Sequence, residues 1–254
     1  MNSNERVLAA LEHREPDRVP LDLGAAEVAG INIKTMGRMR QHLGLNPEVE
    51  LDSLVIQTGV MADDLIERLG VDVKIARPGD PSDPGFEQDL GLVGEHYRYI
   101  DEFGIGWQMP KVGGHYYDLY LNPLAEYETV EEVERYAWPD MSDPARTAGM
   151  AEQARNIARQ DHKAVFLGRA SAGMWEHVMW MTGYEKYYMD MVTNPKLCQA
   201  KMEKILELKM QYWGRVLELV EEEYVIVSCA DDLGGQNGLL VSLDMYQELV
   251  WPYH

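Results

Sequence analysis

Short apolar runs alternate with amphipathic helical segments along the 254 residues of this chain. Four of these runs have the length and the apolar, β-branched character of buried strands. Helical patterns separate them, with an insertion after the second run. Strands that alternate with helices predict a parallel sheet in an α/β protein. The four predicted strands are residues 18–24, 71–79, 163–171 and the run that begins at Val225 and ends before Asp231.

Residues 80–135 interrupt this alternation. They open with a loop rich in proline and glycine, and residues 96–109 then alternate aromatic and polar side chains around a glycine-containing turn. Such a pattern predicts a β-hairpin. We therefore expect residues 1–254 to form a single domain that carries an insertion or lid at about 80–135. Residues 53–70, which precede the second predicted strand, carry a helical pattern along their whole length.

The composition is that of a globular protein with a large excess of acidic residues. There are 43 Asp and Glu against 23 Lys and Arg, which gives a net charge of −20. No basic cluster of the kind that neutralises phosphates is present, so nucleic acid is not an expected partner. Two cysteines cannot form a disulfide framework, which favours a reducing, cytoplasmic location. The charged N-terminus predicts neither an export signal nor a membrane span.

Functional residues of α/β folds usually follow the carboxyl ends of parallel strands. Asp231 and Asp232 come directly after the fourth run, which makes them candidates for catalysis; the alternative is a plain capping function. Adjacent side chains point in different directions on an extended chain. We expect one of them to face a pocket while the other caps a helix or pairs with a base. Gln236 and Asn237 would add amide groups among nearby glycines.

Two further candidates for substrate binding follow the third run. Ser171 lies at its end, and His177 lies on the helix that comes next. The sequence is equally compatible with a pocket histidine and with a core histidine. Cys229 is more typical of a small buried apolar residue than of a ligand. No H-x-x-x-H, C-x-x-C or H-x-C spacing occurs, so no complete metal site is expected within these residues.

Five segments together resemble the uroporphyrinogen decarboxylase superfamily over essentially the whole chain. The opening helix with "EPDRVP" and the later "DDLGGQNG" are the most specific of them. The resemblance implies a (β/α)₈ TIM barrel with its site at the carboxyl ends of the strands. Four strands would be about the first half of the barrel. The resemblance implies a protein roughly 100 residues longer, of which this chain would represent the N-terminal two-thirds. The segments are residues 5–24, 67–79, 101–110, 136–140 and 231–253.

The superfamily implies two activities, and this chain looks more like its methyltransferase branch. Decarboxylases follow the first strand with an arginine-bearing "MRQAGR" motif, whereas residues 22–30 contain no arginine. Since a polycarboxylate substrate needs cationic partners, this departure disfavours the decarboxylation of porphyrinogen acetate arms. Decarboxylation remains the first alternative. A non-catalytic partner subunit is the second.

The methyltransferase resemblance implies transfer of a methyl group between a corrinoid (cobalamin) protein and a thiol or tetrahydrofolate-type acceptor. A zinc ion would activate the acceptor, with its ligands beyond His254. Asp22 would help to shape the pocket, together with the candidates named above. Because half a barrel leaves raw sheet edges, we expect a homo-oligomer or a second chain to complete it.

Overall fold

The computed structural model describes residues 1–169, 172–220 and 225–254. Its centre is a parallel sheet of β3 (Val73–Ala76), β8 (Ala164–Leu167) and β9 (Val225–Ile226), in the order β3-β8-β9. Val73 pairs with Ala164, and Val165 pairs with Val225. The protein is therefore an α/β fold with a parallel sheet, as the sequence predicts. The described strands do not close into a barrel.

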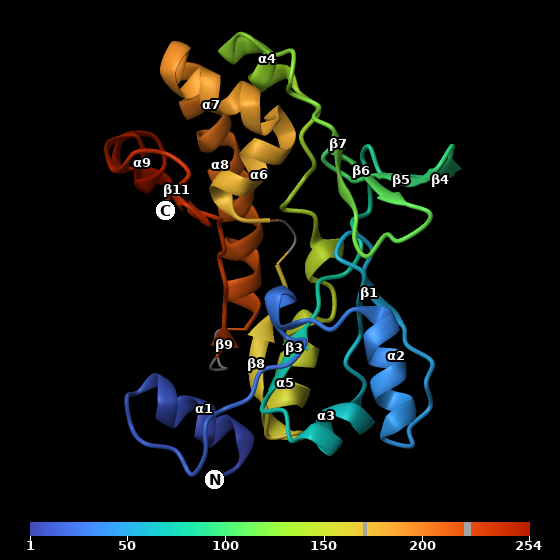
Figure 1. The fold of residues 1–254 in the computed structure, drawn as a ribbon. Coiled ribbons are helices and arrows are strands. Elements are labelled where there is room, and N and C mark those ends of the chain that lie inside the picture. Colours follow the sequence, from blue (N-terminus) through green and yellow to red (C-terminus); the bar gives the residue numbers. More distant parts are fainter. Residues whose placement is uncertain (170–171, 221–224) are drawn as a thin grey trace.

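Helices surround this sheet and form a second layer above its carboxyl ends (Figure 1). Helix α5 packs on β3 and β8, and the long α8 contacts α4, α6 and α7. Trp175, Tyr187 and Tyr212 are fully buried in the resulting core, together with many of the methionines. The helices are α1 (Ser3–Leu11), α2 (Ile33–His42), α3 (Asp63–Leu69), α4 (Val130–Arg135), α5 (Met150–Arg159), α6 (Met174–Thr182), α7 (Tyr184–Thr193), α8 (Pro195–Leu219) and α9 (Leu243–Leu249).

The predicted strand at residues 18–24 is wrong. This segment contributes no strand; its backbone meets the sheet region where the Asp72 N–H donates to the Leu21 carbonyl at 2.8 Å. Pro20 has no N–H to donate to a ladder. The Leu21 N–H donates to the Asp72 carboxylate at 2.9 Å instead of to a backbone carbonyl. Val19 is 82% exposed, so one apolar side chain of the segment is left uncovered.

The predicted helix at residues 53–70 is correct only in its second half. Its first half joins the antiparallel pair of β1 (Leu51–Ser53) and β2 (Thr58–Gly59). Gln57 adopts a left-handed conformation with φ 56°, which no helix allows. Gly59 lies so close to Val49 and Met36 that a Cβ there would meet Val49 at 2.3 Å. Close packing against α2 therefore overrides the helical pattern.

The insertion is larger than the predicted hairpin. It is an antiparallel sheet of four strands, here called the meander, in the order β4-β5-β6-β7. The predicted hairpin is confirmed as its β5–β6 pair, in which Tyr99 lies opposite Trp107. The strands are β4 (Gln88–Val93), β5 (His96–Ile100), β6 (Gly106–Pro110) and β7 (Asp118–Leu121).

Short elements complete the described chain. No helix within the described residues has the length and apolar character that crossing a membrane requires. The remaining elements are the 3₁₀ helices η1 (Glu27–Ala29), η2 (Pro144–Thr147) and η3 (Trp251–Tyr253) and the hairpin of β10 (Gly234–Gly235) and β11 (Gly238–Leu239).

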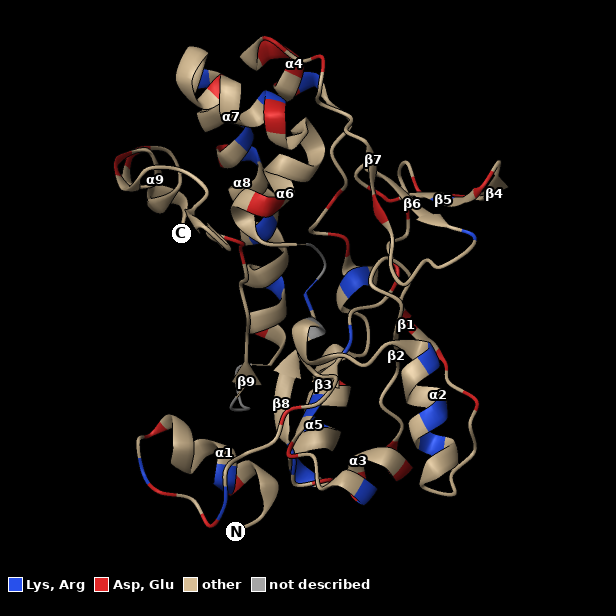
Figure 2. Ribbon diagram, viewed as in Figure 1, with Lys and Arg blue, Asp and Glu red and all other residues tan. Residues whose placement is uncertain are grey.

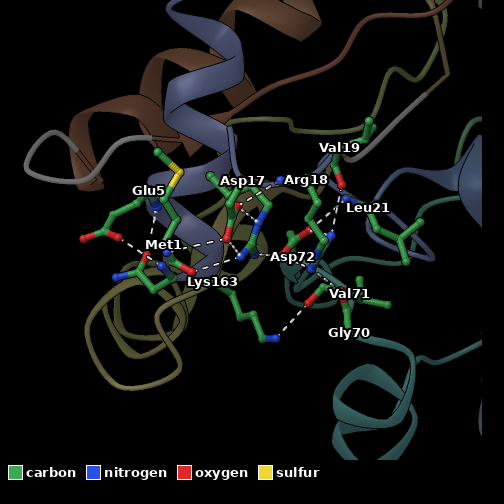
Figure 3. A network of polar contacts seen from close by, with 12 residues as sticks. Met1, Glu5, Asp17, Arg18, Val19, Leu21, Gly70, Val71, Asp72 and Lys163 are labelled. Carbon is green, nitrogen blue, oxygen red and sulfur yellow. Dashed lines mark hydrogen bonds and ion pairs between the residues drawn. The ribbon is translucent and has the colours of Figure 1, made fainter. Parts of the chain in front are cut away.

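A buried carboxylate joins the N-terminal segments to the start of β3 (Figure 3). The Asp72 side chain is 0% exposed. It accepts hydrogen bonds from Arg6 Nη1 at 2.7 Å and from Arg18 Nη1 and Nη2 at 2.7 and 2.8 Å. Arg6 in turn donates to both carboxylate oxygens of Asp17, at 2.6 and 2.9 Å. The network fixes α1 and residues 17–21 against the sheet.

Burial acts to raise the pKa of Asp72, but hydrogen bonds from the Leu21 N–H, the Ser3 hydroxyl and the two arginines outweigh it. The pKa of Asp72 in the folded protein therefore lies below its ordinary value. A lowered carboxyl pKa contributes stability that is present above the unfolded pKa and is lost as the pH falls through the folded pKa. The network should thus weaken in acid, below about pH 4.

We predict that Asp72→Ala destabilises the fold by about 3–5 kcal/mol, because two arginines would remain buried or half-buried without their shared partner. Urea unfolding followed by circular dichroism measures this. Asp161→Ala serves as the control, since Asp161 pairs with Lys74 while 38% exposed and should cost less than about 1 kcal/mol. Equal losses of unfolding free energy in the two variants would contradict the assignment of Asp72 as the residue that fixes the N-terminal segments against the sheet.

The open sheet generates a second prediction. Among the described strands, β3 and β9 are the edges, and apolar side chains near them are exposed: Val19 at 82% and Val227 at 50%. Parallel sheets with uncovered edges and faces are rarely stable in water. We therefore expect the native particle to exceed the 29.0 kDa of one chain. Light scattering that finds a monodisperse monomer with a cooperative unfolding transition would refute this.

Candidate functional site

Arginines follow two of the parallel strands at their carboxyl ends. Arg77 comes directly after β3, and Arg169 stands two residues after the end of β8. Arg169 lines two cavities that open between the sheet, α2 and the meander. The carboxyl edge of the sheet is therefore hollowed, as the position of functional sites in α/β folds predicts.

The first cavity, here called the sheet-end cavity, has a volume of about 490 Å³. Asp52, Arg77 and Arg169 line it, with Asp101 at its border with the meander. Arg77 is held in place on two sides. Its guanidinium pairs with Asp52, and its backbone N–H donates to Gln153 Oε1 at 3.0 Å.

The second cavity, here called the cationic cavity, has a volume of about 670 Å³. Helix α2 contributes Lys34 and Arg38, which are one turn apart and share a face. Arg169 lines the same cavity, with Glu176 and Trp180 of α6 opposite. Basic residues are prominent on α2 in a chain that is acidic overall (Figure 2). Such a lining suits an anionic ligand.

The third cavity, here called the acidic cavity, has a volume of about 190 Å³. It lies between the meander, which supplies Tyr99, Asp101 and Glu102, and α6, which supplies His177 and Trp180. Burial raises the pKa of Asp101 to about 6, against the lowering effect of its N–H donors. Trp180 borders both this cavity and the cationic one, so the two are neighbours.

His177 is both buried and a cavity residue. It is 2% exposed, and its ring meets Phe103 edge-on at 4.4 Å between centroids. Burial, and secondarily the charge of Lys209, hold the pKa of His177 well below 6.5, so the imidazole is neutral at pH 7. His177 is therefore a buried core residue that also lines a cavity, so the structure does not choose between the pocket histidine and the core histidine that the sequence left open.

Asp231 caps a helix that is distant from it in the sequence. Its carboxylate accepts from the Met174 N–H at 2.9 Å and the Glu176 N–H at 2.7 Å, at the start of α6. His254 Nε2 lies 2.8 Å from the same carboxylate. The preceding strand, β9, is an edge strand of the described sheet rather than a central one. Asp231 lines none of the three cavities.

The other predicted site residues lie apart from one another. Asp232, Gln236 and Asn237 are exposed and line none of the three cavities; the last two form the turn between β10 and β11. Asp22 accepts from the N–H groups of Ala25 and Ala26 at 3.1 and 3.2 Å, so it closes a local turn. Ser171 lies outside the described residues.

Sequence reasoning missed the charged residues that line the cavities. Arg77 and Arg169 could have been found, since each stands just past a predicted apolar core of a strand. Lys34 and Arg38 show their shared face only once α2 is known to border a cavity. Asp101 gave no signal, because it sits in what looked like an ordinary hairpin turn.

The described residues offer no donor set for a zinc ion. No group of three His, Cys, Asp or Glu side chains among them could hold a metal. Cys198 is buried, and burial raises the pKa of its thiol to about 12, which disfavours the thiolate that zinc needs. Cys229 is exposed. The zinc implied by the family resemblance therefore does not fit these side chains.

Comparison with known proteins adds one finding. No family model and no curated protein matched the chain. Among solved structures, a methyltransferase from Methanosarcina mazei superposes with a TM-score of 0.52 at 14% sequence identity. The match covers 100% of this chain and 65% of that chain. The fold resembles that of this solved structure. At this identity the likeness concerns the fold alone, and this chain spans less than two-thirds of the other.

The two adjacent aspartates should differ sharply in their effect on stability. Asp231→Ala removes two N–H···O bonds at the start of α6 and should cost about 1–2 kcal/mol, whereas Asp232→Ala should stay within about 0.5 kcal/mol. Thermal unfolding of both variants at one pH measures the difference. A larger effect of Asp232→Ala would contradict the capping assignment.

Proposed function

We propose that this chain belongs to a methyl-transfer protein of the uroporphyrinogen decarboxylase type, and that it holds an anionic methyl acceptor in the cationic cavity. The observation that carries the proposal is the superposition of the whole chain on the methyltransferase from Methanosarcina mazei. The family segments of the sequence support the same branch. The acceptor class would be a thiol that carries a carboxylate or another acidic group.

The lining of the cationic cavity supports an anionic acceptor. Lys34 and Arg38 approach from α2, and Arg169 approaches from the end of β8. Cations on two sides can orient an acidic group and leave the rest of the ligand free to point toward the sheet. Glu176 and Trp180 on α6 would limit the size of the bound molecule.

The methyl donor in this proposal is a corrinoid protein, which supplies a methyl group bound to cobalt. The residues of this chain would bind and orient the acceptor and exclude water around it. Since no zinc donor set is present among the described side chains, activation of the thiol is left to groups outside them. A second chain, or a longer form of this one, is therefore part of the proposal.

Porphyrinogen decarboxylation is the second candidate. One observation favours it: cations do line a cavity at the carboxyl edge of the sheet, although the loop at residues 22–30 lacks arginine. Lys34, Arg38 and Arg169 could pair with substrate carboxylates. The first candidate ranks above it because of the methyltransferase superposition.

The test is ligand binding followed by turnover. The chain should bind 3-mercaptopropionate more tightly than neutral 2-mercaptoethanol by calorimetry, because the carboxylate pairs with cations. Arg38→Gln and Lys34→Gln should each weaken binding by about tenfold. Arg14→Gln is the matched control, since Arg14 is exposed, pairs with Glu12 and lines none of the three cavities.

Turnover separates the candidates when it is measured on the particle that includes the second chain or the longer form. With methylcobalamin and 3-mercaptopropionate, loss of the methyl group from cobalt, read in the visible spectrum, supports methyl transfer. When uroporphyrinogen is supplied instead of these two substrates, release of carbon dioxide supports decarboxylation. If the chain neither binds the anionic thiol nor turns over either substrate, the proposal fails and the non-catalytic partner subunit becomes the better interpretation.

A further inference from the structure

The acidic cavity carries polar groups that the proposed methyl transfer does not use. One wall is the β5–β6 turn of the meander, with Asp101 and Glu102, and the other is α6, with His177 and Trp180. These walls come from segments about seventy residues apart in the sequence. The volume of about 190 Å³ is enough for a small ligand or for one group of a larger ligand.

Asp101 keeps a free acceptor position and borders both this cavity and the sheet-end cavity. Its Oδ1 accepts from the N–H groups of Phe103 and Ile105, at 2.9 and 3.0 Å. Its Oδ2 accepts only from Trp107 Nε1, at 2.9 Å, within the described part of the chain. An ionised carboxylate offers about four acceptor positions, so Oδ2 can take a further donor. Because burial raises its pKa to about 6, Asp101 is mostly ionised at pH 7.5.

The charges around the cavity leave a negative excess. Glu102 is neutralised by Arg146, which donates to both of its oxygens. Among the residues that the structure describes, the partner of Glu87 is neutral: the Tyr99 hydroxyl donates to Oε1 at 2.9 Å. Lys209 brings a positive charge to one side, because it donates to the carbonyl of Ala172, which also lines the cavity. The two carboxylates of Asp101 and Glu87 outweigh this single positive charge.

His177 supplies the independent observation. Its side chain is 2% exposed and lines the cavity, and its Nδ1 has no hydrogen-bond partner among the described residues. Buried polar atoms nearly always have a partner. The neutral ring can accept a hydrogen bond at Nδ1. Nδ1 is itself buried, so an N–H donor in the cavity would satisfy it once a small shift of the ring brings the two together.

We propose that the acidic cavity binds an alkylammonium group, whose N–H donors reach Asp101 and His177 Nδ1. Glu87 adds negative charge at the exposed side. Tyr99 and Trp180 supply aromatic surface, which attracts cations. This ligand class is opposite in charge to the acceptor proposed for the neighbouring cavity, and the inference does not depend on methyl transfer.

The test uses the full chain and three small probes: propylammonium, tetramethylammonium and propan-1-ol. Titrations followed by protein NMR at pH 7.5 measure the three affinities. Propylammonium should bind at least tenfold more tightly than propan-1-ol, which has no charge. No methyl donor or thiol is present, so the result is separate from the test of the proposed function.

Substitutions assign the contacts. His177→Phe should weaken propylammonium binding by about tenfold and leave tetramethylammonium unchanged, because only the first has N–H donors. Asp101→Asn should weaken both cations by about tenfold, and Glu87→Gln by about threefold. Glu95→Gln is the control, since Glu95 is an exposed acid of the same meander outside the cavity.

Propylammonium binding no tighter than that of propan-1-ol would overturn the proposal. So would an equal loss in Glu95→Gln and Glu87→Gln. If Asp101→Asn fails to fold, because its carboxylate orders the turn, Glu87→Gln and His177→Phe still decide the matter. An equal effect of His177→Phe on both cations would remove His177 from the contact set and refute the stated geometry.

Discussion

The buried carboxylate of Asp72 is the interaction on which the arrangement of the N-terminal third depends. It stands just before β3 and accepts from two arginines and one backbone N–H. A buried charge is tolerated only when it is paired and hydrogen-bonded. Arg6 on α1 and Arg18 in the following loop both donate to this carboxylate, and they bring their segments to the sheet. The loop is held at the start of β3 by these side chains and by one backbone bond, from the Asp72 N–H to the Leu21 carbonyl, without forming a strand.

A second polar anchor sets the position of the meander. Glu102, in the β5–β6 turn, pairs with the buried Arg146 of η2, and Arg146 Nε also donates to the Asp140 carbonyl at 2.8 Å. The Tyr136 hydroxyl donates to the carbonyl of Phe103 at 2.6 Å. These contacts hold the turn over α6, which is why Asp101 and His177 border one cavity. The acidic residues of this cavity are therefore positioned by the contacts that attach the meander to η2 and to Tyr136.

Capping at a distance explains the aspartate pair that the sequence makes so conspicuous. Gly173, directly before α6, lies against Ala230 and Asp231, where a Cβ would meet the Ala230 carbonyl oxygen at 1.9 Å. Only glycine permits this approach. The Asp231 carboxylate then reaches the free N–H groups of the first helical turn, where negative charge is favoured. The Asp231 carboxylate thus joins the segment after β9 to the start of α6.

The sequence alone determined the α/β class, the parallel strands β3, β8 and β9, and the existence of an insertion, because hydrophobic periodicity and turn residues are local signals. It also pointed to a fold like that of a methyltransferase. It did not predict that residues 18–24 would stay a loop, since that depends on the distant Asp72. Nor did it predict which charged side chains would meet. Lys34 and Arg38 are far in the chain from Arg169, and Asp101 is far from His177. Packing between elements brings each set to one cavity, and no local pattern records that packing.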